Sequence, residues 1–84
     1  MHSADVITLV VLTPESALLE KRVSKVSLPG TKGRFMVLKS HAPLISSLDE
    51  GYIVNESEGA EEKLFVFGGF VEILNDRITA CVEV

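Results

Sequence analysis

The stretch that decides the fold runs from Val26 to Asp49 and has the sequence VSLPGTKGRFMVLKSHAPLISSLD. It contains two glycines, two prolines, one histidine and short apolar runs. Gly and Pro at this density would interrupt a helix. Short apolar runs between Gly and Pro positions are typical of β-strands joined by tight turns. The segment therefore predicts a strand, a turn, a second strand, a rigid corner and a third strand.

Runs of the same kind occur along the rest of the chain, separated by turn residues about every eight to twelve positions. No run is long and periodic enough to predict a helix of normal length. We therefore expect an all-β fold, an antiparallel β-sandwich or flattened barrel of about eight to ten short strands. The 84 residues predict one domain, 1–84, in which Met1–Ala4 is expected to be frayed.

Several turns follow from residue type. Gly30 and Gly33 are both expected to adopt the positive φ that tight hairpins require, and Asn75-Asp76 is a favourable turn pair. The apolar alternation changes phase near Ser24–Lys25, which predicts a bulge or strand break there. The segment from Glu56 to Glu62 is predicted to be a solvated acidic hairpin loop.

Composition and charge disfavour several classes of partner. The net charge is −4 and the chain has no basic cluster, so neither nucleic acid nor direct binding to anionic lipid is expected. No signal peptide is visible, and the longest apolar run is far shorter than the roughly 20 residues of a membrane helix. We expect a soluble, intracellular protein. The single cysteine, Cys81, is interpreted as a buried or half-buried filler.

No catalytic, metal-binding or cofactor-binding constellation can be assembled from the sequence. A structural zinc site needs four suitably spaced Cys or His ligands, and the chain has two histidines and one cysteine. His41 is therefore interpreted as a structural or interface residue. Gly30–Gly33 is followed by a strand pattern, whereas a phosphate-binding loop leads into a helix, so it is interpreted as a hairpin turn. The sequence predicts a protein that is not an enzyme and has no cofactor.

Three phenylalanines, Phe65, Phe67 and Phe70, flank the pair Gly68-Gly69, which is expected to separate two strands. Packing of these rings inside the sandwich is the first interpretation. A partner surface at the Gly-Gly bend is the alternative, because glycines inside a strand pattern often mark a bulge or a close backbone approach.

Two phrases together resemble one family. The stretch that opens this section, continued by FVFGGFVEI at residues 65–73, is similar to the epsilon subunits of F-type ATP synthases. That family typically has VPGxxGxFGVLPxHAPL followed by FxxGGFxEV, and the similarity covers Val6 to Val84. The resemblance implies a non-catalytic β-sandwich on the central stalk, which contacts the gamma subunit and the polar loops of the membrane c-ring and helps couple c-ring rotation to ATP synthesis.

The resemblance also implies which residues face each partner. The residues expected to face the c-ring are Gly30, Thr31, Lys32, Gly33, Arg34, Lys39, Ser40 and His41. The residues expected to face the gamma subunit are Thr13, His41, Ala42, Pro43 and Ser46. Contact with the membrane is expected only through the complex, on the cytoplasmic face of a bacterial inner membrane.

The chain departs from the family pattern at four positions. Met36 replaces a usual glycine, so a larger side chain must be housed there. Lys39-Ser40 replaces a usual Pro-Gly, which is expected to loosen the corner before His41. Arg34 stands where an acidic residue is common, which suggests a c-ring loop of different charge. Many members of the family continue into a two-helix C-terminal domain, whereas this sequence ends at Val84, either as a naturally short subunit or as a truncated one. If the subunit is naturally short, coupling without the helical brake on hydrolysis is predicted.

Two other interpretations remain open. One is a free-standing β-sandwich module that binds a peptide or a carbohydrate. The other is a small cupin-like enzyme, which is disfavoured because such sites normally use several histidines. Co-purification with a gamma-like partner, affinity for a ligand, or retained metal would distinguish the three.

Overall fold

A computed structural model describes residues 6–84, and the expectation of a frayed Met1–Ala4 lies outside this range. Within the described residues there are nine β-strands and no helix. The strands are β1 (Ile7–Leu12), β2 (Ala17–Val23), β3 (Lys25–Gly30), β4 (Gly33–Val37), β5 (Leu44–Leu48), β6 (Gly51–Ser57), β7 (Ala60–Val66), β8 (Gly68–Leu74) and β9 (Arg77–Glu83). None of the residues from 6 to 84 lies in a helix that could span a membrane.

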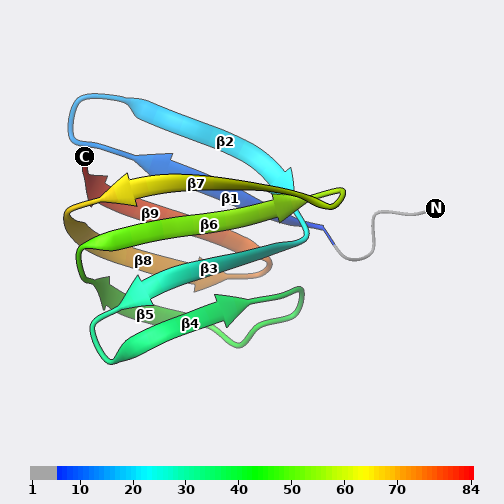
Figure 1. Ribbon diagram of the computed structural model, residues 1–84. Helices are drawn as coiled ribbons and strands as arrows, with labels where there is room; N and C mark the ends of the chain where they lie inside the picture. Colours follow the sequence, from blue (N-terminus) through cyan, green and yellow to red (C-terminus); the bar gives the residue numbers. More distant parts are fainter. Residues whose placement is uncertain (1–5) are drawn as a thin grey trace.

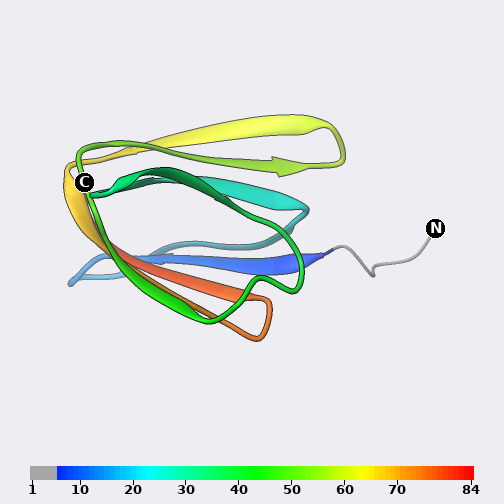
Figure 2. The same cartoon turned by 90° about the horizontal axis from the view of Figure 1, so that it is seen from below.

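The strands form two layers that face each other (Figures 1 and 2). One layer has the order β2-β1-β9-β8-β5, and the other consists of β4-β3-β6-β7. A single residue pair, Gly30 with Leu48, joins the layers through β3 and β5. This arrangement confirms the predicted all-β sandwich.

One pairing differs from an all-antiparallel sandwich, because β1 and β9 run parallel. Each connection reverses the chain, so the first and ninth strands point the same way (Figure 1). They are neighbours in the sheet, and their ladder is therefore parallel, with Leu9 opposite Ile78 and Leu12 opposite Cys81. Residues far apart in sequence are thus placed at the centre of the first layer.

The core lies between the layers and is built by alternate residues of each strand. Val26 and Leu28 point inward from β3 and are fully buried, as their alternation with Ser27 predicts. Their inward neighbours on β1 and β9 are aliphatic too, including Leu9 and Ile78. At about 25 cal/mol per Å² of apolar area, this aliphatic core is the main stabilising term of a domain this small.

Three turn predictions are confirmed, and the one for Gly30 is wrong. Asn75 and Asp76 have φ of 53° and 60°, as a primed hairpin turn requires, and Gly33 has a φ of 125°. The strand break falls at Ser24. Gly30, however, has no positive φ and lies in β3. It is buried with Gly33 O and the Phe35 ring so close that a Cβ would lie 2.8 and 2.9 Å from them, so crowding explains this glycine.

The acidic loop is also shorter than predicted. β6 and β7 continue to a turn at Glu58-Gly59, so Glu56, Glu61 and Glu62 belong to strands. β-Strands tolerate these charges because their side chains lie at the surface. The pair Gly68-Gly69 likewise begins β8 instead of separating strands. Gly69 fits there because a Cβ would lie 2.1 Å from the Cys81 carbonyl oxygen.

Candidate interaction surface

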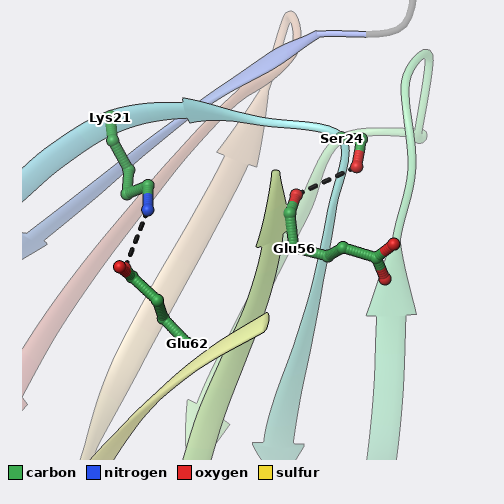
Figure 3. A network of polar contacts seen from close by, with 4 residues as sticks. All are labelled: Lys21, Ser24, Glu56 and Glu62. Carbon is green, nitrogen blue, oxygen red and sulfur yellow. Dashed lines mark hydrogen bonds and ion pairs between the residues drawn. The ribbon is translucent and has the colours of Figure 1, made fainter. Parts of the chain in front are cut away.

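The two narrow sides of the sandwich differ. On the side formed by β2 and β7, Lys21 Nζ lies 2.7 Å from Glu62 Oε1 and links the layers. Nearby, Ser24 Oγ donates to the Glu56 carbonyl at 2.9 Å (Figure 3). The Ser24 amide donates to the same oxygen at 2.8 Å. These contacts link the two layers on this side, and the outer edges of β2 and β7 have no strand partner among residues 6–84.

The opposite side is formed by β4 and β5, and the layers are joined there at the end that carries Gly30 and Leu48. Among residues 6–84, β4 pairs only with β3, and β5 pairs along its length only with β8. The outer edges of both strands therefore present unpaired main-chain groups, which are templates for a partner. We call these two edges, the turn at residues 31–34 and the corner at residues 39–43 the open side.

The predicted interface residues lie at two ends of this side. The turn at residues 31–34 is at one end of β4 and the corner at residues 39–43 is at the other (Figure 1). β4 has five residues, which corresponds to roughly 17 Å. The structure therefore does not bring the eight predicted c-ring residues together in one patch.

The predicted gamma-facing residues are divided as well. His41, Ala42 and Pro43 lie in the corner, and Ser46 follows in β5, half-buried and opposite Val71. Thr13 lies in the β1–β2 turn at the other end of the sandwich (Figure 1), where its hydroxyl accepts from the Ser16 amide at 3.2 Å. Thr13 is thus grouped with the turn at residues 31–34 by position along the strands, and not with His41.

The turn at residues 31–34 is fastened to the opposite layer by main-chain bonds. Thr31 N donates to Ser47 O at 3.2 Å, and Asp49 N donates to Pro29 O at 2.7 Å. Arg34 donates from Nη2 to the Tyr52 carbonyl oxygen, so its guanidinium has an acceptor within the domain. These bonds hold the turn while Lys32 remains exposed.

Met36 is housed at the surface. It pairs with Ser27 across β3 and β4, and its side chain is 52% exposed. The sandwich accommodates this residue without placing it in the core. The substitution therefore adds apolar surface to the open side.

The corner at residues 39–43 is held by Asp76 from the β8–β9 turn. Asp76 Oδ1 accepts from Ser40 N at 2.6 Å, and Oδ2 accepts from Lys39 Nζ at 2.9 Å. The Ser40 amide and the Lys39 ammonium together lower the pKa of Asp76 below its usual value. The expectation that Lys39-Ser40 loosens this corner is therefore wrong, because both residues are tied to a distant carboxylate.

His41 is half-buried in the same corner. Its amide donates to the Leu38 carbonyl at 3.2 Å, and Nδ1 lies 2.7 Å from the Ala42 carbonyl oxygen. A carbonyl oxygen only accepts, so Nδ1 is the donor in this contact. These contacts are local, which agrees with a structural or interface role.

Exposed apolar side chains lie near the corner and on the outer face of the β5 layer. Ile45 of β5 is 73% exposed, and Leu38 and Phe70 are about half exposed. Ile45 is paired with Glu72 and Ser47 with Phe70, so Ile45 and Phe70 project from the same outer face. The pair Leu44-Ile45 is the sequence signal for an exposed apolar residue in this strand. Adjacent residues of a strand point to opposite faces, so one of two apolar neighbours must point outward.

The aromatic rings near Gly68-Gly69 are also more exposed than their first interpretation predicts. Phe67 and Phe70 are 59% and 53% exposed, so neither is packed in the core. Phe65 is half-buried on the outer face and contacts Tyr52 and Phe67 edge to face, with ring centroids 5.2 Å apart in both pairs. The alternative of an exposed surface at this bend is therefore the better description of these rings.

A shallow hollow of about 380 Å³ adjoins these rings at the end of the sandwich that carries Thr13. The residues that line it are Thr13, Pro14, Glu15, Phe67, Val82, Glu83 and Val84. Across residues 6–84 no group of three or more His, Cys, Asp or Glu is arranged to hold a metal ion. Cys81 is half-buried, as predicted.

The fold defines a class, a small β-sandwich domain. The sequence pattern of the family described as ATP synthase, Delta/Epsilon chain, beta-sandwich domain matches residues 6–84. The chain belongs to this family.

Curated relatives agree. The chain is 41% identical over 80 residues to the ATP synthase epsilon chain of Desulfitobacterium hafniense, which covers 95% of this chain and 61% of that protein. It is 41% identical over 75 residues to the epsilon chain of Carboxydothermus hydrogenoformans, covering 89% and 56%. The chain thus spans about three fifths of the length of the curated relatives it matches.

Solved structures share the fold at lower identity. A chain in the Euglena gracilis mitochondrial ATP synthase structure of OSCP, F1 and c-ring superposes with a TM-score of 0.85 and 21% identity, covering 94% of this chain and 51% of that one. A chain in the central stalk and c-ring structure from Tetrahymena thermophila gives 0.77 and 12%, covering 92% and 63%. These likenesses concern the β-sandwich.

Proposed function

We propose that the chain is a non-catalytic subunit of a rotary ATP synthase, which joins the gamma subunit to the c-ring and couples c-ring rotation to ATP synthesis. The observation that carries the proposal is the family match over residues 6–84. Relatives that are 41% identical are named as ATP synthase epsilon chains, and one structural neighbour belongs to a central stalk and c-ring assembly. In this role the protein is peripheral to the membrane, on the cytoplasmic face of a bacterial inner membrane.

The open side supplies the contact with the gamma subunit in this proposal. It combines strand edges that can extend a sheet with exposed apolar residues such as Ile45 and Met36. Protein interfaces gain most of their affinity from a few apolar anchors in a patch that excludes water. The corner with His41, Ala42 and Pro43 is continuous with Ile45 along the chain and belongs to this contact.

The turn at residues 31–34 supplies the contact with the c-ring. It lies at the other end of β4, so one domain can meet two partners about 17 Å apart. Lys32 is exposed there and Arg34 is held by the Tyr52 carbonyl, so the turn itself carries two basic side chains. A c-ring loop with acidic or carbonyl groups is its complement.

The first experiment measures binding of the chain to a purified gamma subunit from the same organism. Ile45→Ser should raise the dissociation constant by about tenfold, since the loss of one apolar anchor costs more than about 1 kcal/mol. Leu18→Ser is the matched control, because Leu18 is 44% exposed on β2 of the opposite narrow side. Equal effects of the two substitutions, or no binding by the unchanged chain, would reject the proposed contact.

A second experiment tests the charge at the turn. Arg34→Glu should weaken assembly with the c-ring at low salt, and high salt should reduce the difference because exposed charges are screened. Arg22→Glu on β2 is the control, since Arg22 is exposed on the other narrow side. If Arg34→Glu leaves assembly unchanged at both salt concentrations, the electrostatic part of the proposal is wrong.

A further inference from the structure

The corner at residues 39–43 has a conformation that its own residues do not favour. Ser40 has a φ of 68°, a left-handed conformation that costs energy for any residue with a Cβ. Lys39 has no ring to restrict its φ, as a proline would. The His41 amide closes a turn on the Leu38 carbonyl at 3.2 Å, which is one weak local bond. Something outside the segment must therefore hold it.

Asp76 lies where it can hold this corner, because its own turn is fixed to the rest of the sheet. It lies in the two-residue turn between β8 and β9, where Leu74 pairs with Arg77. The Asp76 carbonyl accepts from Thr8 N at 3.0 Å, which fastens this turn to the start of β1. The main chain of Asp76 is thus hydrogen-bonded to β1 within the tight turn that joins β8 to β9, so the carboxylate starts from a fixed position.

Both carboxylate oxygens of Asp76 are used, and each has a donor in the corner. Oδ1 accepts from the Ser40 amide at 2.6 Å, and Oδ2 accepts from Lys39 Nζ at 2.9 Å. Hydrogen bonds to a charged acceptor are roughly twice as strong as neutral ones. The hydrogen bond from the Ser40 amide fixes the peptide group between Lys39 and Ser40. The hydrogen bond from the ammonium fixes the Lys39 side chain.

We propose that Asp76 is a positioning residue that holds the Lys39–Pro43 corner in the shape that the gamma subunit binds. It does not touch the partner in this proposal. It acts through Ser40 and Lys39, which set the direction in which His41, Ala42 and Pro43 face. The inference rests on the proposed function for the identity of the partner, while the order of the corner itself needs no partner.

The first measurement is made on the 84-residue chain alone by amide hydrogen exchange and NMR. Asp76→Ala should speed exchange of the amides of residues 40–42 by about tenfold or more, since local opening sets their exchange rate. Asp49→Ala is the matched control, an exposed aspartate at the opposite end of the sandwich. Asp76→Asn keeps the Oδ1 acceptor and should have a smaller effect, which separates the two bonds and guards against a variant that does not fold.

A pH titration gives a readout that a general loss of stability would not move. In the unchanged chain, the Ser40 amide resonance should shift as Asp76 is protonated, because that amide is bonded to Oδ1. The shift should be absent in Asp76→Asn and should move toward higher pH in Lys39→Met, where the ammonium no longer favours the charged form. A Ser40 resonance that ignores pH would overturn the proposal.

The second measurement is affinity for the gamma subunit. Asp76→Ala should weaken binding by about fivefold to tenfold, the cost of binding through a corner that is only partly in its competent shape. If the corner amides exchange fast in Asp76→Ala but its affinity for the gamma subunit stays within twofold of that of the unchanged chain, the positioning role is overturned. If the unchanged chain itself does not bind gamma, the proposed function fails, and the exchange result alone then decides whether Asp76 holds the corner.

Discussion

The turn at residues 31–34 and the corner at residues 39–43 sit at opposite ends of β4 and keep their shapes by different means. The turn depends on two glycines, one crowded and one with a positive φ, inside a continuous ladder of β3 and β4. The corner uses no glycine and depends on one carboxylate 36 residues away. One end of the proposed interface is therefore encoded locally, and the other by a contact that exists only in the folded domain.

The sharpest way to break the local end is Gly30→Ala. A Cβ there would lie 2.8 Å from Gly33 O and 2.9 Å from two Phe35 ring atoms. We expect a loss of about 2–3 kcal/mol in the free energy of unfolding, as in other overpacked sites, measured by urea denaturation. A loss below that of Gly33→Ala would mean that the Phe35 ring turns aside and that crowding does not explain this glycine.

Gly33→Ala tests backbone conformation without crowding. Gly33 has a φ of 125° and no heavy atom within 4 Å of a Cβ placed on it. The substitution should cost about 1–2 kcal/mol, because a residue with a Cβ rarely adopts this region. The same urea experiment measures it. An unchanged midpoint would show that the turn relaxes to another type at no cost.

Ser40→Gly should have the opposite sign and a smaller size. Glycine removes the strain of the left-handed φ of 68° and keeps the amide that Asp76 accepts from. After its greater freedom in the unfolded chain is allowed for, we expect a gain of about 0.5–1 kcal/mol. Ser46→Gly in β5 is the control and should destabilise, because glycine weakens a strand interior. A loss in both variants would contradict the assigned strain.

The smallest effect is the pH dependence of the corner. The pKa of Asp76 is lowered from 3.8 in the folded protein, so its contribution is present at neutral pH and is lost as the pH falls through the lower folded value. The difference in urea midpoint between the unchanged chain and Asp76→Asn should therefore exist at pH 7 and shrink at about pH 3. A difference that does not change with pH would exclude the charge of Asp76 as its source.

The sequence predicts the fold well for a physical reason. Strand residues alternate with period two, and turn glycines and Asn-Asp pairs have strong local preferences, so the layers and most turns follow from short windows. The local range of these rules also explains two expectations that are wrong. The expectation of a positive φ at Gly30 is wrong because local sequence rules take no account of the packing of the Phe35 ring. The expectation that Phe67 and Phe70 pack inside is wrong because composition does not indicate which face of a strand is covered by the other layer.

The corner shows the limit of such reasoning more clearly. Lys39-Ser40 has neither the ring of proline nor the freedom of glycine, so a local rule predicts a loose segment. Asp76 supplies the missing constraint, and no pattern within a few residues of Ser40 points to it. The division of the predicted interface between the ends of β4 is of the same kind, because strand direction decides which turns share an end.

The parallel pairing of β1 with β9 has a consequence for synthesis of the chain. β1 is made first, yet one of its two edges has no partner until Arg77–Glu83 leaves the ribosome. Until then β1 and β8 both carry an edge of unpaired main-chain N–H and C=O groups at the centre of the first layer, where strands from different nascent chains can pair. The last seven-residue strand thus acts as the closing piece of the domain. A chain that ended before residue 77 would lack β9, and the unpaired edges of β1 and β8 would be its most aggregation-prone part.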